Sequence, residues 1–185
     1  MASVALGQDH TVAVTKTGAM YTWGSNQHGQ LGYPLDLTVN KDNVQKVPRK
    51  IISNLKRIDI LGVAASGLHS VCFSKEDLYT WGLNRGQLGY SSGDDGPIQS
   101  TPKKVATLLA PVEMVTAIDN ATICLLKTKV VQIFANGGHF RVTYPPPPVN
   151  PELTLLVSLL TDSQIILSAY PSYPSSVHDK CTPPT

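Results

Sequence analysis

The sequence predicts an all-β protein built from repeated four-stranded units, and three observations support this. An aromatic and glycine-rich phrase occurs twice, as YTWGSNQHGQLGY at 21–33 and as YTWGLNRGQLGY at 79–90. Charged residues make up only 15% of the chain, while Gly and Pro contribute 14 residues each. Apolar residues alternate with small or polar ones in several short segments. These features favour short strands and turns over long amphipathic helices.

The first copy of the repeat covers residues 4–33. HTVAVT has the alternation of a strand, and MYTWG is a second segment rich in aromatic and β-branched residues. NQHGQLG then turns on its two glycines and leaves Leu31 as its apolar anchor. The first copy is therefore predicted to be a strand–turn–strand–turn unit.

The second copy covers residues 47–90 and repeats these features. It begins with VPRKI, in which a proline precedes two basic residues, and RIDILGVAAS leads into the second histidine. The alternating segments predict four strands in this unit: Arg49–Ile51, Ile58–Ala65, His69–Ser74 and Leu78–Trp81. The first copy starts at Val4, so it is expected to lack the Pro-basic strand.

A degenerate third copy covers residues 101–138. It repeats the Pro-basic start as TPKKV and a strand as ATICLL, but Ala121 stands where the other copies have histidine. VVQIFANGG is the nearest substitute for the Tyr-Thr-Trp-Gly segment. Residues 141–185 are expected to be a largely irregular Pro-rich tail, because nine of the 14 prolines lie there.

The repeats resemble those of the regulator of chromosome condensation family, whose pattern combines a histidine, Tyr-x-Trp-Gly-x-Asn and Gly-Gln-Leu-Gly. The segments 7–10 and 21–32 match well, whereas in the second copy Ser66 replaces the first glycine. The resemblance is specific over 4–33 and 63–90 and fades beyond. It implies β-propeller blades. Residues 1–140 are thus expected to form an incomplete β-propeller, with two clear blades and a degenerate third, since a seven-bladed ring needs roughly twice this length.

Within this family the chain is similar to a member that inhibits a Bruton-type cytoplasmic tyrosine kinase. The resemblance implies a protein-binding module that contacts the pleckstrin-homology region of that kinase and down-regulates its signalling. Guanine-nucleotide exchange on a small GTPase, or a role as substrate scaffold of a ubiquitin ligase, are the alternatives. A cytoplasmic location is expected, with no membrane span and with any peripheral membrane association made through the partner.

A basic linker follows the first copy. Between residues 41 and 57 there are six basic residues and one acidic residue, Asp42. Such an excess is typical of a solvated loop or of a site for an acidic partner. Nucleic acid is not expected, since the formal net charge of the chain is only +2. The candidate partner-binding residues are Lys46, Arg49, Lys50, Lys56 and Arg57.

Two repeated residue types have structural interpretations. His10 and His69 share one position, and because no acidic or cysteine partner recurs at a fixed offset, a hydrogen bond within each unit is expected instead of a metal site. Trp23 and Trp81 are expected to pack between neighbouring units, as large aromatic side chains do.

The sequence contains no motif that would indicate an enzyme. There is no Gly-x-Ser-x-Gly, no phosphate-binding loop and no His-Glu-x-x-His. The three cysteines do not form a disulfide framework, and two of them, Cys72 and Cys124, stand in predicted strands. We therefore expect a protein without catalytic activity, cofactor or bound metal.

Overall fold

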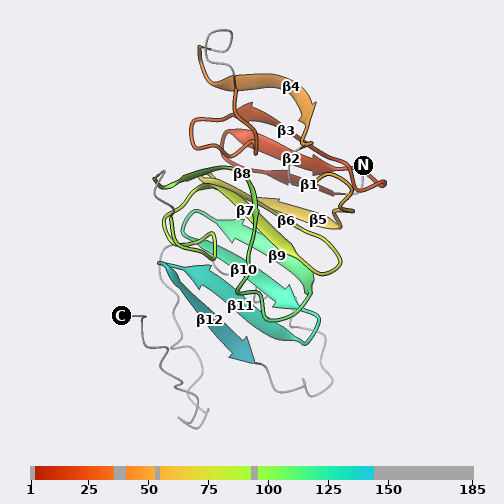
Figure 1. The fold of residues 1–185 in the computed structure, drawn as a ribbon, viewed down its shortest axis with the longest axis vertical. Helices are drawn as coiled ribbons and strands as arrows, with labels where there is room; N and C mark the ends of the chain where they lie inside the picture. Colours follow the sequence, from red (N-terminus) through yellow and green to blue (C-terminus); the bar gives the residue numbers. More distant parts are fainter. Residues whose placement is uncertain (1–2, 36–40, 53–54, 93–95, 144–185) are drawn as a thin grey trace. The chain divides into compact units, whose positions relative to one another are not determined.

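The computed structural model describes residues 3–35, 41–52, 55–92 and 96–143. In these ranges the chain forms twelve strands and no helix, arranged as three four-stranded antiparallel sheets (Figure 1). The predicted all-β architecture of four-stranded units is therefore confirmed. The described part holds no helix that is long and apolar enough to cross a membrane. The tail predicted for 141–185 lies outside the described residues except for its first three.

The first sheet is complete, contrary to the prediction from sequence. It consists of β1 (Ser3–Leu6), β2 (His10–Val14), β3 (Met20–Ser25) and β4 (Val44–Lys50), in that order. The Pro-basic segment, predicted to open the second unit, forms the end of β4, where Lys50 pairs with Tyr21 and Arg49 with Thr22. The reason is that β3 has an edge to fill, and the basic strand supplies its hydrogen-bonding partner.

The second sheet follows the same plan with β5 (Gly62–Ala65), β6 (His69–Phe73), β7 (Leu78–Leu83) and β8 (Ile98–Lys104). Strand β5 is shorter than the predicted Ile58–Ala65. The segment before it turns at 55–57, where Arg57 has a φ of 65°. A residue in this left-handed conformation interrupts an extended strand, so pairing starts only at Gly62.

The third sheet is also complete, although its sequence has diverged. Its strands are β9 (Val112–Ile118), β10 (Ala121–Leu126), β11 (Val130–Ala135) and β12 (Gly138–Thr143). Phe134 pairs with Thr122 as Trp81 pairs with Ser70, so Phe134 takes the tryptophan position. Strand β12 extends to Thr143, which places 141–143 in the sheet and not in an irregular tail.

Two apolar cores lie between neighbouring sheets. The first core joins Val12, Val14, Met20, Leu31 and Ile51 of the first repeat to Cys72, Tyr79 and Trp81 of the second. The second core joins Val71, Leu78 and Val105 to Cys124, Leu126 and Phe134. Trp81 is fully buried, as predicted for packing between units, whereas Trp23 is only half-buried. The first strands β1, β5 and β9 lie side by side along the series of sheets (Figure 1).

The two buried histidines connect the sheets to each other. His10 Nε2 lies 2.7 Å from Ser70 Oγ in the second sheet, and His69 Nε2 lies 2.9 Å from Thr122 Oγ1 in the third. The predicted hydrogen bond within each unit occurs only for His69, whose Nδ1 is 2.8 Å from Ser66 Oγ. In the first unit Gly7 has no side chain to offer, so the prediction is wrong there. The histidines thus contribute to packing between sheets.

Candidate partner-binding site

The five basic residues predicted to bind a partner lie on β4 and in the turn that follows it. Lys46, Arg49 and Lys50 belong to β4, and Lys56 and Arg57 to the turn. All five side chains are exposed. The structure gives them different surroundings, and they do not form one cluster.

Arg49 packs on an aromatic ring. Its guanidinium carbon lies 4.6 Å from the ring centroid of Tyr33, and Lys103 lies 4.5 Å from the ring of Tyr90 in the second sheet. The hydroxyl of Tyr33 donates a hydrogen bond of 3.0 Å to the backbone oxygen of Thr22. Burial raises the pKa of Tyr33, and the Thr22 hydrogen bond and the Arg49 charge oppose this. The recurrence of this cation–π contact indicates a structural role for Arg49.

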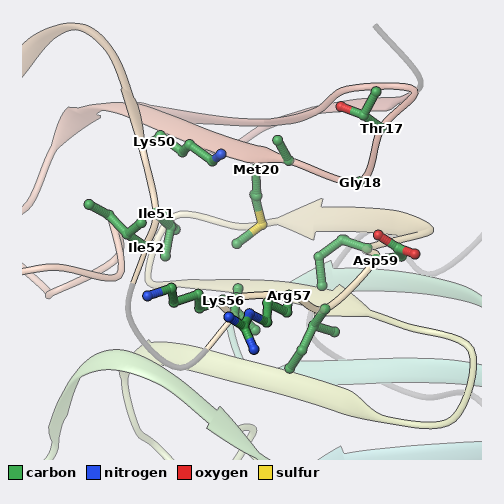
Figure 2. Close-up of a pocket in the computed structure, with 13 residues that line it drawn as sticks. Thr17, Gly18, Met20, Lys50, Ile51, Ile52, Lys56, Arg57 and Asp59 are labelled. Carbon is green, nitrogen blue, oxygen red and sulfur yellow. The ribbon is translucent and has the colours of Figure 1, made fainter.

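Lys56 and Arg57 flank a cavity next to the first core. This cavity of about 220 Å³ is bounded by residues 17–20, 50–52 and 55–60. Buried side chains of Met20, Ile51 and Ile60 form its apolar lining. Figure 2 shows Lys56 and Arg57 next to each other on one side of Met20, and Lys50 on the other side. The cavity therefore combines an apolar floor with cationic side chains at its border.

The turn at 55–57 holds the two cations outward. Leu55 is buried, and its backbone oxygen accepts a hydrogen bond of 3.2 Å from the nitrogen of Ile58. The positive φ of Arg57 is unusual for a residue with a side chain and costs about 1 kcal/mol or more. The buried leucine and the turn hydrogen bond compensate for this cost and fix the exposure of Lys56 and Arg57.

These cations are not neutralised within the described part of the chain. The two ion pairs found there join Lys104 to Asp77, at 2.7 Å, and Lys129 to Glu113, at 2.6 Å. None of the five candidate residues takes part in either pair. The acidic residue among those lining the cavity is Asp59, which has no ion pair within the described ranges. The region thus presents an excess of positive charge to solvent.

The described residues provide no arrangement typical of a metal site. In those ranges, no three His, Cys, Asp or Glu side chains converge as metal ligands. Burial raises the pKa of the Cys124 thiol to about 12 and also raises that of Cys72. Thiols with such pKa values stay protonated at neutral pH and are poor nucleophiles.

One surface of the first sheet was not predicted from the sequence. On β1, Val4 is 44% exposed and Leu6 is 74% exposed. Their counterparts in the second sheet, Val63 and Ala65, pack against the first core. An alignment of the two copies could have indicated this surface. It matches Val4 and Leu6 with Val63 and Ala65, and the residues that cover Val63 and Ala65 come from the preceding unit.

Comparison with known proteins gives a consistent family assignment. The regulator of chromosome condensation (RCC1) repeat profile matches residues 17–73, and a second profile of the same repeat matches residues 1–30. BTB/POZ domain-containing protein 1 of Schizosaccharomyces pombe is 39% identical over 76% of this chain. The mouse protein named inhibitor of Bruton tyrosine kinase is 38% identical over 72%. The chain spans 10% of the length of each of these two relatives.

A solved structure supports the fold. Prp20p of Saccharomyces cerevisiae superposes with a TM-score of 0.63 at 20% identity, over 76% of this chain and 38% of that one. The three sheets are therefore blades of an incomplete β-propeller of this type. The published structure describes the binding of Prp20p to Gsp1p and histones. At this level of identity the likeness shows the fold alone.

Proposed function

The chain belongs to the family of proteins that carry RCC1 repeats, and on this premise we propose that it is a protein-binding module that inhibits a cytoplasmic tyrosine kinase of the Bruton type. In this proposal it acts in the cytoplasm by direct contact with the pleckstrin-homology region of the kinase, without catalysis of its own. Occupying that region would keep the kinase from the membrane or from its active arrangement.

The observation that carries the proposal is a group of cations that have no ion pair among the described residues and that lie beside an apolar cavity, in a chain similar to a protein named for inhibiting this kinase. Lys56 and Arg57 are good contact candidates, because they border the cavity and neither has an ion pair or a ring contact among the described residues. Arg49 is a weaker candidate, since Tyr33 engages its guanidinium. Charged residues at the border of an interface mainly accelerate association.

A salt series measured by surface plasmon resonance tests this proposal. The parent chain is compared with Lys56→Glu/Arg57→Glu for binding to the immobilised kinase. The parent should associate more slowly as salt rises, because exposed charges are screened within about 8 Å at physiological ionic strength. The variant should associate about ten times more slowly than the parent at low salt, and the difference should shrink at high salt.

The matched control is Lys75→Glu/Lys127→Glu, which makes the same change of charge in exposed turns of the second and third sheets. It should associate nearly as fast as the parent. Equal association rates for the parent and the Lys56/Arg57 variant at every salt concentration would show that the basic linker is not part of the interface. No binding of the parent at all would refute the kinase as partner, and a GDP-release assay with a small GTPase would then test nucleotide exchange.

A further inference from the structure

Two rows of side chains recur on one face of every sheet. The pairing registers place them in line across the strands. The first row is Leu6, Thr11 and Trp23 in the first sheet, Ala65, Ser70 and Trp81 in the second, and Ala117, Thr122 and Phe134 in the third. The second row is Val4, Ala13, Tyr21 and Lys50; then Val63, Cys72, Tyr79 and Lys104; then Val115, Cys124, Gln132 and Arg141. In the first sheet these seven residues are called the first-sheet face.

In the second sheet this face is covered by the preceding repeat. The indole nitrogen of Trp81 donates a hydrogen bond of 2.9 Å to the backbone oxygen of Gln30, and Ser70 Oγ donates one of 2.7 Å to the same oxygen. Gly32 of the same Gly-Gln-Leu-Gly turn lies against the indole, since a Cβ added there would be 3.0 Å from Trp81 Nε1. The occupant of this face is thus a tight turn that presents a carbonyl oxygen.

In the third sheet the equivalent face is covered in the same way. Phe134 is fully buried, and a Cβ added to Gly89 of the second Gly-Gln-Leu-Gly turn would be 3.0 Å from its ring. Val115 and Ala117 pack against the second core. Two sheets of different sequence therefore use the same face for the same kind of contact.

The first-sheet face has no such cover from the described residues. Leu6 and Val4 are exposed, and Trp23 and Thr11 are half-buried. The indole N–H of Trp23 has no acceptor in the described ranges, whereas that of Trp81 has one. An apolar face with an unpaired donor at its centre is typical of an interaction surface.

A missing carboxylate distinguishes this face from its counterpart. In the second sheet Asp77 Oδ1 lies 2.7 Å from the amino nitrogen of Lys104, and Asp77 Oδ2 accepts a hydrogen bond of 3.3 Å from the Tyr79 hydroxyl. Ala19 holds the same place in the first sheet: its nitrogen donates to Thr15 Oγ1 at 3.1 Å, as the nitrogen of Asp77 donates to Ser74 Oγ at 3.1 Å. Within the described ranges, Lys50 and Tyr21 consequently lack the acidic partner that Lys104 and Tyr79 have.

We propose that the first-sheet face binds a turn of a partner protein that brings a backbone carbonyl oxygen to the Trp23 indole N–H and an acidic side chain to Lys50 and Tyr21. The apolar part of the turn would cover Val4 and Leu6, as the first core covers Val63 and Ala65. The equivalent faces of the second and third sheets are each covered by a turn, and Lys50 adds a positive charge to the first-sheet face. These two observations favour an acidic turn as the occupant. This face shares Lys50 with the residues that bound the Lys56–Arg57 cavity, but its contacts at Trp23, Val4 and Leu6 lie outside that lining, so the proposal does not depend on the kinase being the partner.

A cyclic peptide that contains Gly-Gln-Leu-Gly followed by two glutamates is the probe. Titrated into the isotope-labelled chain, it should shift the indole N–H resonance of Trp23 and leave that of Trp81 unchanged. Replacing both glutamates by glutamine should weaken binding about tenfold, because a charge-assisted hydrogen bond is lost. Trp23→Phe, which keeps an aromatic ring but removes the donor, should also weaken binding.

Ala19→Asp is the decisive variant, because it supplies from within the carboxylate that Asp77 supplies in the second sheet. It should fold like the parent and bind the glutamate peptide about ten times more weakly. Lys127→Ala makes the same change of net charge on an exposed turn and should bind like the parent.

Three results would overturn the proposal. The first is an unmoved Trp23 resonance at millimolar peptide, and the second is equal affinity of the parent and Ala19→Asp. The third is a Trp23 indole N–H that exchanges as slowly as that of Trp81 in the chain alone. Slow exchange that depends on concentration would assign the face to a second copy, and slow exchange that does not would assign it to residues of the same chain.

Discussion

The same side chain has unequal weight in the two clear copies of the repeat. Trp23 and Trp81 hold the same register position, opposite Thr11 and Ser70. Trp81 is covered by the preceding repeat and hydrogen-bonded to the Gln30 carbonyl, while Trp23 is half-buried. Position in the repeat predicts the residue type. The neighbouring sheet determines how far the side chain is buried, and therefore how much it contributes to the free energy of unfolding.

The two tryptophans should differ in their contribution to stability. Trp81→Ala should lower the free energy of unfolding by about 3–5 kcal/mol, because it leaves a large cavity in the first core. Trp23→Ala should lower it by about 1–2 kcal/mol, since much of its area is already in water. Urea unfolding of the two variants and the parent measures both values. Equal losses would show that Trp23 is as well covered as Trp81.

Burial of the histidines makes stability depend on pH. Burial lowers the pKa of His10 to about 4 and that of His69 to about 3, from 6.5. The folded protein thus keeps both rings neutral at pH values where the unfolded chain takes up protons. Their contribution is fully present above pH 6.5 and is lost as pH falls towards 4.

Between pH 7.5 and pH 5 each histidine should therefore cost about 2 kcal/mol of stability. His69→Gln, which can still hydrogen-bond Ser66 and Thr122, should be less stable at pH 7.5 but should lose about half as much on acidification. Denaturant midpoints measured at both pH values test this, and an unchanged pH dependence in the variant would exclude His69 as a source.

At the scale of the elements, the sequence predicts where the strands lie better than it predicts which sheet each strand joins. The histidine and tryptophan strands of both clear copies were found correctly, because their alternating residues are specific to half-buried strands. The sequence pattern places the Pro-basic strand in the wrong sheet, because a repeated pattern does not show where one structural unit ends and the next begins. Only the pairing of Lys50 with Tyr21 shows that this strand closes the preceding sheet.

The candidate site was predictable only in part. The excess of basic residues at 41–57 predicts the candidate site, and all five residues are exposed, while their role in binding stays a prediction. The contact of Arg49 with Tyr33 depends on a turn that brings residue 33 back over β4, which composition does not reveal. The absence of a counterpart to Asp77 is visible in the sequence, yet it has meaning only once Ala19 is placed beside Lys50.

A glycine in each tryptophan strand allows that strand to bulge. The registers of β3 and β7 shift next to Gly24 and Gly82, whose φ angles are 106° and 117°. A Cβ on Gly82 would clash with the backbone oxygen of Leu68 and would lie 2.7 Å from the Cα of His69. Glycine at these two positions therefore permits a close backbone approach.

Gly82→Ala should therefore be more damaging than an equivalent change elsewhere. We expect a loss of at least about 3 kcal/mol, from the positive φ and the backbone clash together. Gly96→Ala is the control, since its φ is 96° but no atom lies within 4 Å of an added Cβ. It should cost about 1–2 kcal/mol. Thermal or urea unfolding compares them, and similar losses would mean that the clash relaxes without cost.

In the whole folded part, stability depends on the contacts between sheets. The second sheet packs on both sides, against the first core and the second core, whereas the first and third sheets each have one such contact in the described residues. In an array of this kind, stability is approximately a sum of unit terms and nearest-neighbour terms. The sequence predicted three units, but it could not show that the middle unit carries both contacts.

Amide hydrogen exchange should follow this order. All residues of β6 are buried and all residues of β12 are exposed, so β6 amides should exchange slowest and β12 amides fastest. The β6 amides open only when both cores open, which requires close to the full unfolding free energy, while β12 can separate from β11 alone. Mass spectrometry of peptic fragments after exchange would measure both segments. Comparable protection of β12 and β6 would contradict this order. It would mean that residues outside the described ranges, or a second molecule, cover the third sheet, and that the three units open together.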